Sequence, residues 1–170
     1  TFDATAEGSY FVVAAPRINY SGTAFINGST AYVAGQEITL GHDSGLFDIT
    51  IQVGSAAAQP ITHLGTTGGP ASTGAGDNHI IYGVAGGQTG LITSIFSGNL
   101  GFDPAVSALI ENGTIILTAN YNVSGTQVVN SFNQFDVTSL SPAELIIDAA
   151  QITSDIVAHS SDLAQVSSAF

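Results

Sequence analysis

The segment Gly8–Val53 reads GSYFVVAAPRINYSGTAFINGSTAYVAGQEITLGHDSGLFDITIQV, and short apolar runs in it are separated by glycine, Asn-Gly or proline. The runs have the length of β-strands, the separators are residues that favour turns, and no helical period joins them. We therefore predict a succession of short strands at Phe11–Ala15, Ala24–Ile26, Ala31–Ala34, Glu37–Leu40 and Phe47–Val53.

The clearest alternation lies between Asp48 and Val53, where apolar Ile49, Ile51 and Val53 alternate with polar residues. Such a pattern places one face of a strand against a core and the other in solvent. Residues 37–40 repeat the pattern, so we expect Ile38 and Leu40 to face inward as well. Many short strands with tight corners indicate an all-β domain, either a sandwich or a β-solenoid.

Six motifs are spread over most of the chain: Val13–Ile18, Asn27–Leu40, Gly45–Gly54, His63–Pro70, Ser97–Phe102 and Glu111–Thr118. Each is a structural repeat pattern rather than a catalytic signature. In these motifs the chain resembles filamentous-haemagglutinin-type exoproteins.

The resemblance implies a right-handed parallel β-helix that Gram-negative bacteria secrete through a partner outer-membrane pore. It further implies an extracellular or cell-surface location and a structural or adhesive role. The Asn-Pro-Asn secretion signature of the family is missing, so we interpret residues 1–170 as one β-solenoid segment of a larger protein. No charge follows Asp162, and such an uncapped end leads us to expect end-to-end assembly into a rod or filament.

Composition excludes several classes of function. The 170 residues carry a net charge of −12, because Arg17 is the only arginine and lysine is absent. Nucleic-acid binding needs basic side chains that displace counterions from phosphates, so we expect no such partner. Cysteine is absent, which rules out disulfides and thiolate metal sites. No apolar run approaches the length of a transmembrane helix.

The remainder of the chain alternates between β-type runs and polar stretches. Residues 54–78 are rich in glycine, serine, threonine and alanine, and we interpret them as a loop excursion from the solenoid. Further strands are predicted at 79–84, 91–96 and 114–123, the last with a bend near 119–121. Short helices are alternatives at 104–111 and after the capping box Ser141–Glu144, although strands are favoured over 145–168.

The only cluster of triad-type residues is His42-Asp43-Ser44, which lies between two glycines. Neighbouring residues of a strand or turn point in different directions, so we interpret the cluster as a turn. The four histidines are too widely spaced for a local metal motif, and we expect surface or packing roles for His42, His63, His79 and His159.

A carbohydrate-active β-helix enzyme, a lyase or glycosidase for extracellular polysaccharide, is the alternative function. It needs two or three carboxylates that converge on a groove, and Asp43 or Asp48 could acquire an acidic neighbour from an adjacent coil. Only Arg17 is available to hold an acidic sugar, and we expect it to sit at a structural corner beside a carboxylate.

Two weaker patterns complete the search. Gly74–Asn78 faintly resembles a calcium-binding turn, but the required spacing is not met and the motif does not recur. Asn27-Gly-Ser29, Asn112-Gly-Thr114 and Asn122-Val-Ser124 match the glycosylation pattern and, in a bacterial protein, are ordinary turn and strand residues. We therefore predict no enzyme activity and no catalytic, cofactor-binding or metal-binding residue. The expected partners are further copies or segments of this protein, the secretion pore and a cell-surface or polysaccharide receptor.

Overall fold

The computed structural model describes residues 1–70, 77–88, 92 and 94–101, and beyond these the strand segments β10 to β16. All regular structure in the described residues is β, which confirms the predicted all-β class. No helix long and apolar enough to span a bilayer occurs in this part of the chain.

Eleven of the described strands form one large sheet. Its strands are β1 (Phe2–Ala15), β2 (Ile18–Tyr20), β3 (Thr23–Ala34), β6 (Ile61–His63), β7 (Thr66–Gly68), β8 (His79–Ala85), β9 (Ile95–Leu100), β10 (Gly113–Ala119), β14 (Leu145–Asp148), β15 (Asp155–Ala158) and β16 (Ala164–Ser167).

A second sheet contains the other five described strands, and all of its pairings are antiparallel. Its strands are β4 (Glu37–Asp43), β5 (Leu46–Val53), β11 (Asn122–Ser124), β12 (Gln127–Val129) and β13 (Gln134–Asp136).

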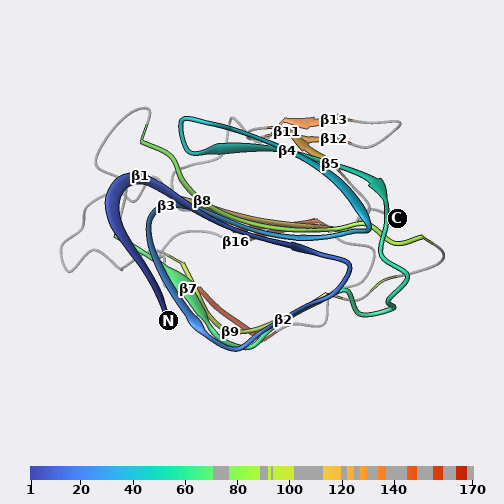
Figure 1. The fold of residues 1–170 in the computed structure, drawn as a ribbon, viewed down its shortest axis with the longest axis horizontal. Coiled ribbons are helices and arrows are strands. Elements are labelled where there is room, and N and C mark those ends of the chain that lie inside the picture. Colours follow the sequence, from blue (N-terminus) through green and yellow to red (C-terminus); the bar gives the residue numbers. More distant parts are fainter. Residues whose placement is uncertain are drawn as a thin grey trace.

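Every pairing within the large sheet is parallel. β1, β3, β8, β10, β14 and β16 lie side by side in the order in which they occur along the chain. β2, β6 and β9 form a parallel series of their own, also in chain order. Figure 1 shows β1, β3 and β8 between the layer that contains β4 and β5 and the strands β2, β7 and β9.

The sheet around β3 and β8 is buried on both faces, as parallel sheets usually are. One face packs on a core between this sheet and β2, β6 and β9, and the other packs on β5. Across the β3–β8 pair, each of the two tyrosines has a small neighbour in register: Tyr32 lies beside Gly83, and Tyr82 lies beside Ala31. This alternation lets two large rings fit into adjacent strands, on opposite faces of the same sheet.

Three rings from three parallel strands stack inside the first core. Tyr20 of β2, His63 of β6 and Phe96 of β9 are in register, and the ring centroids lie 5.1 Å and 6.1 Å apart. Thr67 lies next to the stack, with its hydroxyl 2.5 Å from the hydroxyl of Tyr32 and 2.8 Å from Nε2 of His63. Tyr32, Thr67 and His63 are therefore linked in one hydrogen-bonded chain.

β3 is bent at Gly28, so that one strand contributes to two parts of the large sheet. Thr23 to Phe25 pair with β7, whereas Thr30 to Ala34 pair with β8. Gly28 has a φ of 150°, and a Cβ at this position would overlap the backbone carbonyl of Ser9 in β1. A glycine is required because the backbones of β1 and β3 approach too closely here for any side chain.

Several predicted boundaries need correction. The runs at 24–26 and 31–34 are one strand, because Asn27-Gly28 marks a bend within β3 and not a turn between two strands. The predicted excursion over 54–78 contains β6 and β7, which are three residues each and too short to show alternation. The predicted strand 91–96 is replaced by β9, which continues through Ser97-Gly98-Asn99 despite the turn-like composition.

Other expectations are confirmed. The strand at 79–84 is β8, and β10 and β11 lie within the predicted strand 114–123, apart from Gly113 and Ser124 at their ends. The bend predicted near 119–121 falls on residues 120 and 121, outside those that the structure describes. The described parts of 145–168 are strands. Leu40 is an exception, since its side chain stays 37% exposed on the edge strand β4. The alternatives at 104–111 and 141–144 lie outside the described residues.

We expect the two faces of β5 to differ in their contribution to stability. Ile49 is fully buried between the sheets, whereas Thr50 is exposed. Ile49→Ala should lower the free energy of unfolding by about 2–5 kcal/mol, because it leaves a cavity in the core. Thr50→Ala should change it by less than about 0.5 kcal/mol. Urea denaturation measures both values, and equal losses would contradict the packing of β5 on β8.

We also expect stability to fall at alkaline pH. Burial raises the pKa of Tyr32 and of Tyr82 above the ordinary value of 10.0. Above that pH the unfolded chain releases phenol protons that the folded protein retains, so the free energy of unfolding decreases as pH rises. The slope should be about 1.4 kcal/mol per pH unit for each tyrosine.

Denaturation curves recorded between about pH 8 and pH 11 measure this slope. Tyr82→Phe should reduce it by the contribution of one tyrosine, and the double variant with Tyr32→Phe by that of two. A stability that does not change above pH 10 would contradict the burial of both hydroxyl groups.

Candidate functional site

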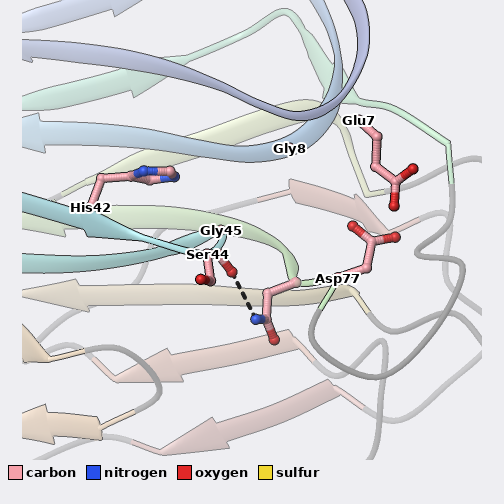
Figure 2. A pocket seen from close by; sticks show the side chains of 7 residues that line it. Glu7, Gly8, His42, Ser44, Gly45 and Asp77 are labelled. Carbon is pink, nitrogen blue, oxygen red and sulfur yellow. Dashed lines mark hydrogen bonds between the residues drawn. The ribbon is translucent and has the colours of Figure 1, made fainter.

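A cavity of about 680 Å³ lies where three distant parts of the chain meet. The parts are the bend in β1, the turn between β4 and β5, and the residues that precede β8. Figure 2 shows the carboxylates of Glu7 and Asp77 turned toward one another, with His42 and Ser44 on the opposite side. The lining residues are Glu7, Gly8, His42, Ser44, Gly45, Asp77 and Asn78.

The turn between β4 and β5 is a two-residue hairpin loop. Asp43 pairs with Leu46, and the φ angles of Ser44 and Gly45 are 50° and 81°. Two positive φ angles are typical of the type I′ turn, which matches the twist of the paired strands. A Cβ on Gly45 would overlap the carbonyl oxygen of Asn78. The backbone of the turn is therefore pressed directly against the segment that leads into β8.

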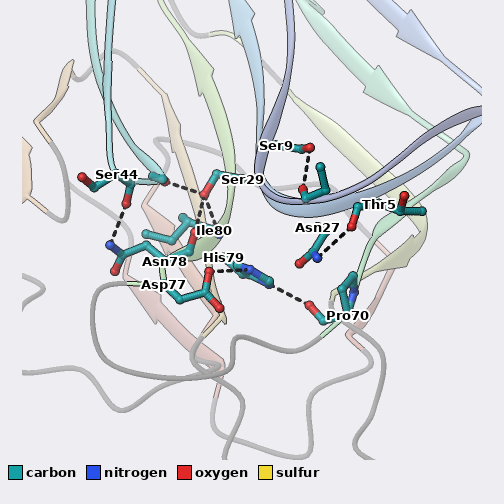
Figure 3. A network of polar contacts seen from close by, with 12 residues as sticks. Thr5, Ser9, Asn27, Ser29, Ser44, Pro70, Asp77, Asn78, His79 and Ile80 are labelled. Atoms are coloured by element: carbon teal, nitrogen blue, oxygen red, sulfur yellow. Dashed lines mark hydrogen bonds and ion pairs between the residues drawn. The ribbon is translucent and has the colours of Figure 1, made fainter.

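Ser29 of β3 connects the hairpin turn to the segment that precedes β8 through hydrogen bonds, as Figure 3 shows. Its buried hydroxyl lies within hydrogen-bond distance of the carbonyl oxygens of Gly45 and Asn78, which share its one hydrogen, and its oxygen accepts from the N–H of Ile80 at 3.1 Å. Asn78 also donates from Nδ2 to the carbonyl of Ser44 at 2.9 Å. One side of the cavity is thus fixed by hydrogen bonds before any ligand is present.

A buried histidine supports the other side. Nδ1 of His79 lies 2.7 Å from the carbonyl oxygen of Pro70, which only accepts, so this nitrogen carries a hydrogen. Nε2 lies 3.0 Å from Oδ1 of Asp77, and a hydrogen bond there needs a further proton on either group. Asp77, whose side chain is 13% exposed, is therefore held in place by His79.

Glu7 has a different environment. It is exposed on β1, and it makes no hydrogen bond or ion pair with the described residues. Of the two carboxylates at the cavity, Glu7 is therefore the one available to a ligand.

An aromatic rim flanks the cavity through His42. The ring centroid of Tyr10 lies 4.5 Å from that of His42, and Phe47 supports both rings at 6.2 Å and 4.9 Å. Tyr10 is 59% exposed, which makes it the most exposed of the large apolar side chains in the described residues. A polar cavity and an accessible aromatic surface are thus adjacent.

The structure places the predicted candidates as follows. His42-Asp43-Ser44 does form the end of a hairpin, with the Ser44 hydroxyl donating to Oδ1 of Asp43 at 2.9 Å. His42 does not lie between them, so the arrangement is not that of a catalytic triad. Asp48 lies opposite Gly41 and Ser124, and it gains no acidic neighbour from these strands.

The histidines have three different environments. His42 is exposed, His63 and His79 are fully buried, and His159 lies outside the described residues. Within the described ranges, no three histidine, aspartate or glutamate side chains are grouped as a metal site would require. Arg17 is exposed at the predicted corner, between β1 and β2, and it forms no ion pair with a carboxylate of the described residues. The carboxylate partner stays a prediction, because acidic residues such as Asp103 and Glu111 lie outside the described residues.

The structure also places the calcium-like sequence and the first of the three glycosylation patterns. Asp77 and Asn78 of the calcium-like sequence line the cavity, whereas Gly74–Gly76 lie outside the described residues. In the first glycosylation pattern, Asn27 donates from Nδ2 to the carbonyl of Thr5 within the sheet, and Ser29 is buried. Both residues are therefore engaged in the fold.

No sequence pattern indicates Glu7 or Tyr10 as site residues. They lie about 35 residues from the hairpin turn, and only the parallel pairing of β1 with β3 brings them to it.

No protein family, curated protein or solved structure matches this chain.

We expect Ser29 to be essential to the cavity wall. Ser29→Ala removes the partner of two carbonyl groups and one N–H group at a buried position. The free energy of unfolding should fall by about 1–3 kcal/mol, because unpaired buried polar groups are costly. Ser9→Ala is the matched control, since the exposed hydroxyl of Ser9 bonds only to the carbonyl of Ala6. Urea denaturation of both variants tests this, and equal losses would show that the Ser29 contacts add nothing.

Proposed function

We propose that this chain is a structural and adhesive segment of an extracellular bacterial protein, built as a right-handed parallel β-helix. The observation that carries the proposal is the pairing of strands in chain order, always parallel. β1, β3, β8, β10, β14 and β16 follow one another in this way. This order supports the proposal, because each coil of a solenoid returns the chain to the same sheet in the same direction.

The spacing of paired residues supports the same proposal. Ala15 lies beside Ala34, which is 19 residues later, and Leu145 lies beside Ala164 at the same spacing. Elsewhere the spacing is larger because further strands are inserted: β4 and β5 occur between β3 and β6, and β11 to β13 occur between β10 and β14. The inserted strands pair with one another and form an outer layer over the sheet.

End-to-end association is supported by the edge strand β1. Among the described strands β1 pairs only with β3, so the other edge of a 14-residue strand has no partner there. Unpaired strand edges are sites for strand addition by another chain or segment. We propose that a further coil, from this protein or from another copy, occupies this edge.

The cavity favours an adhesive role over the carbohydrate-active enzyme. It contains two carboxylates, and one of them, Asp77, is engaged by His79. Glycoside hydrolysis needs two carboxyl groups free to act on opposite sides of one bond. Secretion through an outer-membrane partner and a Gram-negative cell-surface location belong to the proposal through the family resemblance of the sequence motifs.

The assembly can be tested by blocking the β1 edge. Ala14→Lys places a charge on the exposed part of this edge, and Thr50→Lys adds the same charge to the exposed face of β5 as a control. We expect the native chain and Thr50→Lys to form rods at high concentration in about 0.15 M salt, where screening weakens the repulsion of the −12 charge. Ala14→Lys should remain monomeric.

Sedimentation velocity and negative-stain microscopy measure the outcome. A native chain that stays monomeric at all concentrations would contradict the assembly. Rods formed equally well by Ala14→Lys would show that association uses another surface.

A further inference from the structure

We propose that the cavity and its aromatic rim bind a sugar that is neutral or carries an amine, and that they discriminate against sulfated and uronate sugars. This inference rests on the adhesive role proposed above and names the chemical class of its ligand. Three features of the site carry it: the exposed ring of Tyr10, the mixed polar lining and the charge of Glu7.

The aromatic rim supplies a stacking surface. Tyr10 is 59% exposed, although His42 and Phe47 hold its ring from the side of the protein. A single exposed aromatic residue needs no explanation by itself. Here, however, the ring partner His42 is also part of the cavity lining. A tyrosine ring combines an apolar face, suited to the C–H face of a pyranose, with a hydroxyl that can hydrogen-bond.

The lining suits a polyhydroxylated ligand. Glu7 offers carboxylate oxygens, Ser44 offers a hydroxyl, and His42 offers ring nitrogens at the cavity surface. Sugar hydroxyls both donate and accept, so they can satisfy such a mixture of groups. The volume of about 680 Å³ is in the usual range for small-molecule sites and far exceeds that needed for a metal ion.

The site is also held in place before binding. Ser29 connects the hairpin turn to the start of β8, and the backbone of Gly45 is pressed against Asn78. His79 holds Asp77 from the buried side. A ligand therefore meets a wall that is already ordered, which reduces the entropic cost of binding.

Charge determines which sugars fit. Glu7 has no ionic partner in the described residues. The chain contains no lysine. Its one arginine, Arg17, lies ten residues after Glu7, beyond the C-terminal end of β1. A sulfate or uronate group would therefore be repelled by Glu7, without a cation to compensate. A sugar amine would be attracted, and this preference should weaken as salt screens the charge.

The test is calorimetric titration of the full chain with tetrasaccharides of glucose, galactose, mannose and glucosamine, and with a sulfated, uronate-containing tetrasaccharide. We expect saturable binding of glucosamine or of at least one neutral sugar and none of the sulfated one. Tyr10→Ala should weaken every observed binding by at least about tenfold, because it removes the stacking surface. Glu7→Gln should weaken glucosamine binding about fivefold and neutral sugars less than about twofold, since it removes only the charge.

Matched controls are Leu64→Ala, which truncates another exposed apolar residue, and Glu37→Gln, which neutralises another exposed acid. Both should bind as the native chain does. Absence of binding to all five sugars, equal binding of the sulfated sugar, or unchanged binding by Tyr10→Ala would each overturn the inference. Rod formation is measured separately, so loss of sugar binding with intact rods would remove this inference alone, and the converse would remove only the assembly.

Discussion

The parallel pairing of β3 with β1 on one side and β8 on the other is the interaction on which the rest of the structure depends. It places β3 in the middle of a sheet that is covered on both faces, so the strand contributes to two cores at once. A sheet buried in this way must fit large and small side chains across strands. The register that sets Tyr32 beside Gly83 and Tyr82 beside Ala31 provides this fit. A shift of one residue would exchange the faces of every side chain in the strand.

The buried polar groups reinforce the same register. Ser29 lies in β3, and its hydrogen bonds reach the hairpin turn and the beginning of β8. His63 and Thr67 link the stacked rings of the inner core to Tyr32. The chain has no cysteine and few charged residues, so disulfides are absent and ion pairs are scarce in the described residues. Backbone pairing, apolar burial and these internal hydrogen bonds therefore hold the described residues together.

The cavity is a consequence of this architecture. Glu7 belongs to the first strand, Ser44 to the turn of the outer hairpin, and Asp77 to the segment before β8. They meet because β1, β3 and β8 are neighbours and because the hairpin packs over them. In such an arrangement, residues far apart in the sequence can form one surface site when they lie at the same end of neighbouring strands.

The sequence by itself determined the all-β class and strands such as β5 and β8, since apolar and polar residues alternate from Asp48 to Val53 and turn residues separate the other runs. It did not determine the three-residue strands β6 and β7, which are too short to show alternation. It determined the hairpin turn at Ser44-Gly45, where local chemistry decides the conformation. Only the tertiary structure decided which strands are neighbours in the large sheet, because pairing partners there lie from 19 to 58 residues apart and alternation is the same for any partner. It also decided the site, since Tyr10 and Glu7 become significant only through residues that approach them in space. Local periodicity specifies strands, whereas long-range burial specifies their order.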